Sequence, residues 1–258
     1  MNATTSATAA ELLGSARRSR TAIPPLTSTF PDFTVDEAYG AQLVNVRERL
    51  ESGARIVGHK VGLTSVAMQE MLGVSEPDYG HLLDDMAVTG SVEAGRFLQP
   101  RVEIEIAFVL GEPLKGPGVT EADVLAATRF VAPAIEIIDS RIADWQIKLA
   151  DTVADNGSAG GFVVGDVHTP PSEVDLPAVS ATLSLNGQEV ATGTGAAVLG
   201  DPATAVCWLA NKLAAFGASL DAGHIVLPGS CTRAFDVRAG DQVEARFEGL
   251  GSATVVFE

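Results

Sequence analysis

Two glutamates stand two positions apart in the segment RVEIEIAFVL, at Glu103 and Glu105, and alternation of this kind is typical of a β-strand. Side chains two apart on a strand face the same side of the sheet. A third glutamate, Glu136, interrupts the apolar run VAPAIEII. Buried carboxylates are costly and repel one another, and a hard divalent cation is the simplest compensation. Oxygen-only ligation favours Mg²⁺ or Mn²⁺ over zinc.

Spacing alone leaves other interpretations of these acids open. Glu103 and Glu105 could form the solvated face of an edge strand, because alternating glutamate is ordinary in half-exposed sheets. Glu136 could be buried and paired with Arg141 or Lys148.

Three further positions have residue types that suit chemistry. Lys60, inside IVGHKVGL, is either a partly desolvated cation for catalysis or anion binding, or a lysine that snorkels from a strand end. Asp78, in PDYGHLLDD, is either a functional acid or a turn residue that caps the backbone. Ser158 lies in the small-residue loop DNGSAGGFVVG, which could bring its hydroxyl to a ligand or form a plain tight turn.

The elements that must position these residues begin with helical signals. The first dozen residues are rich in Ala, Thr and Ser and are expected to fray. Thr34 and Glu37 form a capping box that opens a helix, and Gly53 ends it. A strand is then predicted over 54–63, a short helix over 65–73 and a loop over 74–85.

From about Arg101 onward, strands predominate. Two buried strands are predicted over 101–110 and 131–139, with a helix opened by Thr120 between them. Asn186-Gly187 marks a hairpin, Asp201-Pro202 opens a helix that Gly217 ends, and two strands fill 240–258. The sequence therefore predicts an α+β fold, with a helical segment over 1–55 and one strand-rich catalytic unit over 56–258.

Composition excludes several classes of binding partner and site. Of the 258 residues 46% are hydrophobic, and the net charge of −16 argues against nucleic acid and anionic membranes as partners. Two cysteines without CxxC spacing exclude a disulfide framework and a zinc ribbon. The start of the chain lacks signal-peptide features, and no stretch approaches the ~20 apolar residues of a membrane span. We expect a cytoplasmic protein.

Several long segments in order resemble one family. These are GHKVGLTSVAMQEMLGVSEPDYGHLLDDM, RVEIEIAFVL, AIEIIDSRI, DNGSAGGFVVG and LPGSCT, and they are similar to the 2-hydroxypenta-2,4-dienoate hydratases of the fumarylacetoacetate hydrolase superfamily. The resemblance covers about residues 20 to 258 and implies a β-rich roll with helices packed around it.

The resemblance also implies a site. Glu103, Glu105 and Glu136 would bind one Mg²⁺ or Mn²⁺, and Lys60 and Asp78 would line the reacting end of the substrate. Ser158 and Thr232, the latter in LPGSCT, match positions that touch the substrate carboxylate or its 2-oxygen.

The implied activity is the addition of water to a 2-hydroxydienoate in meta-cleavage degradation of aromatic compounds, by a homo-oligomer that could associate with other enzymes of its pathway. A related alternative is decarboxylation of 2-oxo-3-hexenedioate, and a remote one is a non-catalytic, metal-stabilised partner subunit. A decarboxylase must neutralise a second carboxylate on its substrate. For the hydratase we therefore expect no arginine at the far end of the pocket.

Overall fold

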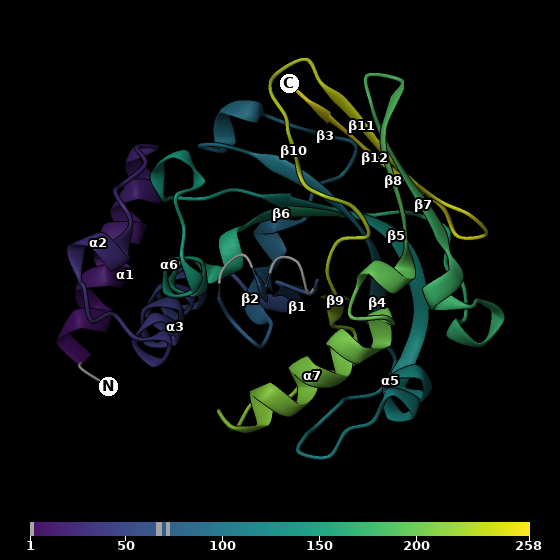
Figure 1. Ribbon diagram of the computed structural model, residues 1–258, viewed down its shortest axis with the longest axis horizontal. Helices are drawn as coiled ribbons and strands as arrows, with labels where there is room; N and C mark the ends of the chain where they lie inside the picture. Colours follow the sequence, from purple (N-terminus) through teal and green to yellow (C-terminus); the bar gives the residue numbers. More distant parts are fainter. Residues whose placement is uncertain (1–2, 66–68, 71–72) are drawn as a thin grey trace.

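The structure, a computed structural model, describes residues 3–65, 69–70 and 73–258. Its strands form two β-sheets, and several helices gather at one end of the molecule (Figure 1). The α+β class and the strand-rich body predicted from the sequence are confirmed. Within the described ranges, no helix has the length and apolar character needed to cross a bilayer.

The larger sheet positions the acids. Its strands run in the order β2-β1-β9-β4-β5-β6, and β10 also pairs with β4. Strands β4 and β5 are the long antiparallel centre of this sheet, and their register sets Glu103 directly opposite Glu136. The strands are β1 (Ile56–Gly62), β2 (Asp78–Leu83), β4 (Arg101–Leu110), β5 (Thr128–Ile138), β6 (Ala159–Val164), β9 (Ile225–Leu227) and β10 (Phe235–Asp236).

The smaller sheet packs on the larger one and closes the core. Its order is β3-β12-β11-β7-β8, and β11 and β12 contact β5. The expected hairpin at Asn186-Gly187 is confirmed, with both residues in the left-handed region that this turn requires. The strands are β3 (Ser91–Val92), β7 (Ser180–Leu185), β8 (Gln188–Thr194), β11 (Gln242–Phe247) and β12 (Gly251–Phe257).

The helices begin and end largely where their capping residues predict. Thr34 accepts a hydrogen bond from the Glu37 amide in a complete capping box, and Gly53 follows the helix with φ +101°. Thr120 and Asp201 likewise accept hydrogen bonds at helix starts. The helices are α1 (Ala3–Ser19), α2 (Leu26–Thr29), α3 (Val35–Glu51), α5 (Glu121–Ala127), α6 (Leu149–Ala154) and α7 (Pro202–Ala214).

The expectation that the first dozen residues fray is wrong. They belong to α1, which packs along α3 at one end of the molecule (Figure 1). Ala9, Ala10 and Leu13 are almost fully buried there. Alanine has the highest helix propensity and its small side chain allows close helix packing, so a composition that suggested a tail forms a packed helix instead.

The prediction of a loop over 74–85 is also wrong. Residues 78–83 form β2, which pairs with β1 as an antiparallel strand and is buried throughout. Its polar Asp, Tyr, Gly and His residues hid the strand pattern, because both faces of β2 are covered by other parts of the protein. The short helix expected over 65–73 lies partly outside the described residues; Gln69 and Glu70 are helical.

The face of β1 and β2 that carries His59 and His81 is buried beneath aromatic side chains. The two imidazole centroids lie 4.9 Å apart, with Tyr79 close to both rings. Within the described ranges, neither Nδ1 atom has a hydrogen-bond partner. Burial lowers the pKa of His59 well below its usual range and the pKa of His81 to about 4. Both imidazoles are therefore neutral in the folded protein near neutral pH.

Acid should destabilise the protein through these histidines. The unfolded chain takes up protons near pH 6.5 and the folded state does not, so the free energy of unfolding falls as pH drops below 6.5. For His81 the loss is roughly 3 kcal/mol by pH 4. In urea unfolding between pH 7 and 4, His81→Phe should flatten this pH dependence. His168→Phe, at an exposed ring, should not. Equal slopes in the two variants would refute the assignment.

Candidate metal centre and catalytic cavity

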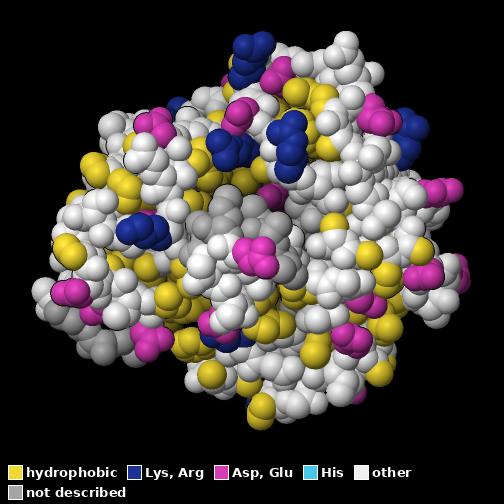
Figure 2. Space-filling view, in the orientation of Figure 1, with side chains coloured by type: hydrophobic (Ala, Val, Ile, Leu, Met, Phe, Trp, Pro, Cys, Tyr) yellow, Lys and Arg dark blue, Asp and Glu magenta, His cyan; other side chains and the backbone are white. Residues whose placement is uncertain are grey.

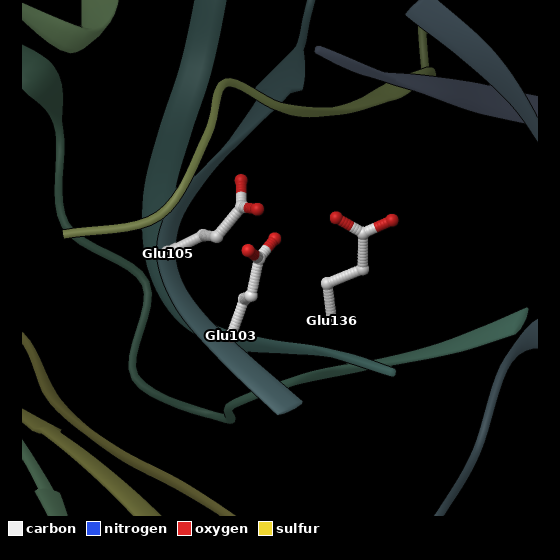
Figure 3. Close-up of side chains that lie close together, drawn as sticks. All are labelled: Glu103, Glu105 and Glu136. Carbon is white, nitrogen blue, oxygen red and sulfur yellow. The ribbon is translucent and has the colours of Figure 1, made fainter. Parts of the chain in front are cut away.

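Three carboxylates converge at the centre of the larger sheet. Glu103 and Glu105 extend from β4 and Glu136 from the neighbouring β5, with their carboxylates directed toward one another (Figure 3). One oxygen from each residue lies within 4.8 Å of the others. The structure thus brings together the three acids singled out in the sequence.

Burial of this cluster rules out the solvated-edge interpretation. Glu105 and Glu136 are fully buried, and β4 lies between β9 and β5 rather than at an edge. The pairing of Glu136 with Arg141 or Lys148 is wrong as well, because within the described residues Glu136 forms its ion pair with Lys60, and Arg141 pairs with Asp155. Like charges directly opposite on paired strands destabilise a sheet, so the arrangement calls for a compensating cation.

The electrostatics of the cluster show how costly it is without an ion. Burial, together with the neighbouring acids, raises the pKa of Glu103 to about 7 and the pKa values of Glu105 and Glu136 above their usual range. Among the described residues, no hydrogen bond reaches either oxygen of Glu136 or Oε1 of Glu105, although Lys60 forms an ion pair with Glu136. Glu105 Oε2 accepts a hydrogen bond from the Gly229 amide at 2.7 Å. These carboxylate oxygens fit the oxygen-only ligand set of a hard divalent cation.

Lys60 lies beside the acids, held by two contacts. Its Nζ donates to the Gly157 carbonyl at 2.9 Å and lies 3.4 Å from Glu136 Oε1. Burial alone would lower the pKa of Lys60, but the carboxylates of Glu136 and Asp78 outweigh it and raise the pKa above its usual value. The lysine is therefore a buried ammonium, which excludes the snorkelling interpretation. An ammonium has three N–H donors, so one remains for the cavity.

Asp78 approaches Lys60 from the paired strand. It faces Gly62 in the β1–β2 register, and a side chain at Gly62 would come 2.1 Å from Asp78 Oδ1. Burial raises the pKa of Asp78, while Lys60 and hydrogen bonds from the Thr152 side chain and the Gly62 backbone lower it. Its Oδ1 atom has no hydrogen-bond partner in the part of the chain that the structure describes. Asp78 is thus a buried acid with a free acceptor rather than a turn cap.

These residues open into one cavity of about 720 Å³. Lys60, Asp78, Glu103, Ser158 and Thr232 all line it, whereas Glu105 and Glu136 lie beneath the lining. The Ser158 hydroxyl is buried and has no hydrogen-bond partner among the described residues. Figure 2 shows Lys and Arg side chains around a hollow on this face, with acidic atoms inside it.

Two arginines lie at the cavity, and the expectation that none reaches the far end of the substrate stays a prediction. Arg101 and Arg233 both line the cavity. Arg101 is paired with Asp236 at 2.7 Å and stacks on the Trp145 ring. Arg233 stacks on Phe235 and makes no ion pair with any carboxylate in the described part of the chain. Arg101 stands two residues before Glu103 and so shares its face of β4, a signal the sequence analysis passed over.

Comparison with known proteins identifies the family of this chain. Residues 70–257 match the family model described as fumarylacetoacetate (FAA) hydrolase C-terminal. The chain is 47% identical to 2-hydroxyhexa-2,4-dienoate hydratase of Comamonas testosteroni, over 97% of this chain and 96% of that protein. It is 46% identical to 2-keto-4-pentenoate hydratase of Paraburkholderia xenovorans, over 97% and 94%.

A solved structure matches over the full length. It is 4-oxalocrotonate decarboxylase from Pseudomonas putida complexed with magnesium and adipate, which is 38% identical, with a TM-score of 0.95 over 100% of this chain and 99% of that one. The fold and the buried acids define an α+β protein with a cluster of three glutamates that could hold a metal ion. The chain belongs to the fumarylacetoacetate hydrolase superfamily, in the branch of the hydratases and decarboxylases.

Proposed function

We propose that this protein is a divalent-metal-dependent hydro-lyase that converts 2-hydroxypenta-2,4-dienoate into 4-hydroxy-2-oxopentanoate during meta-cleavage degradation of aromatic compounds. The observation that carries the proposal is full-length similarity to named hydratases, combined with a cavity whose floor holds three converging glutamates beside a lysine and an aspartate. Small-molecule chemistry suits a cavity of this kind.

Glu103, Glu105 and Glu136 are the proposed metal ligands, and Mg²⁺ is the proposed ion, with Mn²⁺ as a substitute. When bound, such an ion supplies Lewis-acid stabilisation of negative charge on the substrate 2-oxygen. The hydroxyls of Ser158 and Thr232 are proposed to bind the substrate carboxylate or that oxygen, since both residues line the cavity. The apolar side chains that line the cavity would hold the hydrocarbon end of the substrate.

Lys60 and Asp78 are the proposed proton carriers. The dienol loses its hydroxyl proton and gains one at C5, which leaves a 3-ene-2-oxo acid. Water then adds its oxygen at C4 and a proton at C3. The free Oδ1 of Asp78 can accept a proton from the attacking water, and the remaining N–H of Lys60 can donate one. No atoms other than those of one water are gained.

A turnover assay tests this function. Purified protein should consume 2-hydroxypentadienoate when Mg²⁺ is present and stop when EDTA is added, and Mg²⁺ in excess should restore the rate. The dienol absorbs in the ultraviolet, so its loss can be followed directly. Turnover that is equal with Mg²⁺ and with EDTA would refute the metal-dependent hydratase.

One observation favours a second candidate function, decarboxylation of 2-oxo-3-hexenedioate. Arg233 is a cation at the cavity without a carboxylate partner in the described chain, and a substrate with a second carboxylate would supply one. The similar decarboxylase is complexed with adipate, a compound with two carboxylates. Hydration stays the first candidate because the curated relatives quoted above are named hydratases.

Substitution of Arg233 separates the two candidates. If Arg233 binds a second carboxylate, Arg233→Met should lower kcat/KM for 2-oxo-3-hexenedioate by roughly 10²-fold, the loss of a charge-assisted hydrogen bond. Turnover of 2-hydroxypentadienoate should change less than about threefold. Arg238→Met, at an exposed arginine outside the cavity lining, is the matched control. Equal losses on both substrates would exclude a role for Arg233 in choosing between them.

The assembly state belongs to the same proposal. We expect a homo-oligomer that can associate with other enzymes of its pathway, as the family resemblance implies. Light scattering on the purified protein tests the first point, and a monomer at micromolar concentration would contradict it.

A further inference from the structure

A left-handed turn joins α6 to β6 at the wall of the cavity. Asn156, Gly157 and Ser158 have φ values of +58°, +60° and +56° in succession. Only glycine adopts this region freely, whereas asparagine tolerates it and serine seldom does. Such a turn persists only where the surrounding structure holds it, and strained backbone of this kind clusters at functional sites.

The side-chain amide of Asn156 holds the turn against β2. Its Oδ1 accepts a hydrogen bond from the His81 amide at 2.8 Å, and its Nδ2 donates to the His81 carbonyl at 2.9 Å. The amide thus pairs with β2 as a neighbouring strand would. Gly80 allows the approach, because a side chain there would lie 2.1 Å from the Asn156 carbonyl oxygen.

The two residues that follow face the cavity. The Gly157 carbonyl accepts the hydrogen bond from Lys60 Nζ, and the unpartnered Ser158 hydroxyl is buried at the cavity wall. A carbonyl and a hydroxyl on adjacent residues of one short turn move together if the turn shifts on β2. The Asn156 amide therefore fixes the position of both groups relative to β2, the strand that carries Asp78, while the Asp139 amide donates to the Ser158 carbonyl at 2.8 Å from the other side.

We infer that Asn156 is a positioning residue: its amide fixes the turn on β2 and thereby places the Ser158 hydroxyl against the substrate and the Gly157 carbonyl against Lys60. This inference rests on the proposed hydratase function and on the proposed contact of Ser158 with substrate. Asn156 itself does not line the cavity.

The test substitutes glycine at Asn156, because glycine adopts the left-handed backbone freely and removes the side chain with its amide. Asn186→Gly is a matched control in the β7–β8 hairpin. Asn186 also has a positive φ, of +54°, and its amide accepts from the Gln242 amide and donates to Asp241. Each variant is combined with Ser158→Ala in a double-mutant cycle. Mg²⁺ affinity by calorimetry and deuterium uptake of the 156–158 peptide accompany the kinetics.

Asn156→Gly should lower kcat/KM for 2-hydroxypentadienoate at least tenfold, with Mg²⁺ affinity within about threefold of the parent and faster deuterium uptake at 156–158. Ser158→Ala should cost roughly tenfold in the parent and in Asn186→Gly, but less than about threefold in Asn156→Gly. The inference is overturned if Asn156→Gly and Asn186→Gly behave alike, or if Ser158→Ala costs the same factor in every background or nothing in the parent. Absence of hydration by the parent protein would instead count against the proposed function.

Discussion

Replacing Glu105 by glutamine is expected to lower the affinity for Mg²⁺ and the rate of hydration together, each by roughly 10²-fold or more. Loss of even an outer-shell partner of a metal ligand lowers metal affinity or activity by about 10–100-fold, so loss of a ligand should lower them at least as much. Glutamine keeps the shape of the side chain and the oxygen that can accept from the Gly229 amide, but it removes the charge. Excess Mg²⁺ should restore part of the activity.

The same substitution should stabilise the metal-free protein. Glu105 is one of three buried carboxylates whose pKa values are raised by burial and by mutual repulsion, and a neutral amide relieves both costs. We therefore expect a higher Tm than the parent in EDTA and a smaller rise in Tm when Mg²⁺ is added. Glu112→Gln, at an exposed glutamate just beyond β4, is the control. Parent-like Mg²⁺ binding by Glu105→Gln would contradict the ligand assignment.

Replacing Lys60 by alanine should lower kcat by about 10²–10⁴-fold, the usual range for loss of a general acid or base. Mg²⁺ should still bind, with equal or tighter affinity, because the variant loses a cation that lies 3.4 Å from Glu136. Steady-state kinetics and calorimetry measure the two effects separately. A loss of metal binding that matches the loss of rate would mean that Lys60 only supports the metal site.

Two further variants separate the loss of Lys60 chemistry from misfolding of Lys60→Ala. Lys60→Met keeps most of the side-chain volume in a site that is almost fully buried, so it should fold even if alanine leaves a cavity. Lys115→Ala, at an exposed lysine, should leave kcat unchanged. Full activity of Lys60→Met would exclude proton transfer by Lys60.

The parts of the fold that follow local rules were predictable from the sequence. Thr34, Thr120 and Asp201 mark helix starts through hydrogen bonds within their own turns, and Asn186-Gly187 specifies a hairpin through its backbone preference. The apolar runs of β4 and β5 are long enough to predict both strands from the sequence. In each case the information lies within a few residues of the element it determines.

The errors arose where distant parts of the chain decide the structure. Strand β2 carries Asp78, Tyr79 and His81, and only the neighbours that cover both of its faces make a buried strand of it. Helix α1 depends in the same way on the surface of α3. Local periodicity contains neither contact, so no inspection of these segments alone could have found them.

The site residues show the same difference between local and long-range information. Glu103 and Glu105 were predictable as neighbours from strand geometry, whereas the meeting with Glu136 depends on the register of two strands separated in sequence. The contact between Lys60 and Gly157 and the amide pairing of Asn156 join segments that are 97 and 75 residues apart. Arg233 reaches the cavity because the segment after β9 returns to β4.

Metal-dependent hydration is tested most directly by incubating the protein with 2-hydroxypentadienoate and Mg²⁺ in oxygen-18 water. We expect 4-hydroxy-2-oxopentanoate with one solvent oxygen at C4, located by the isotope shift of the C4 carbon resonance, and no product in EDTA. We also expect hydration of this substrate to exceed release of CO₂ from 2-oxo-3-hexenedioate. Unlabelled C4, or CO₂ release faster than hydration, would contradict the hydratase assignment.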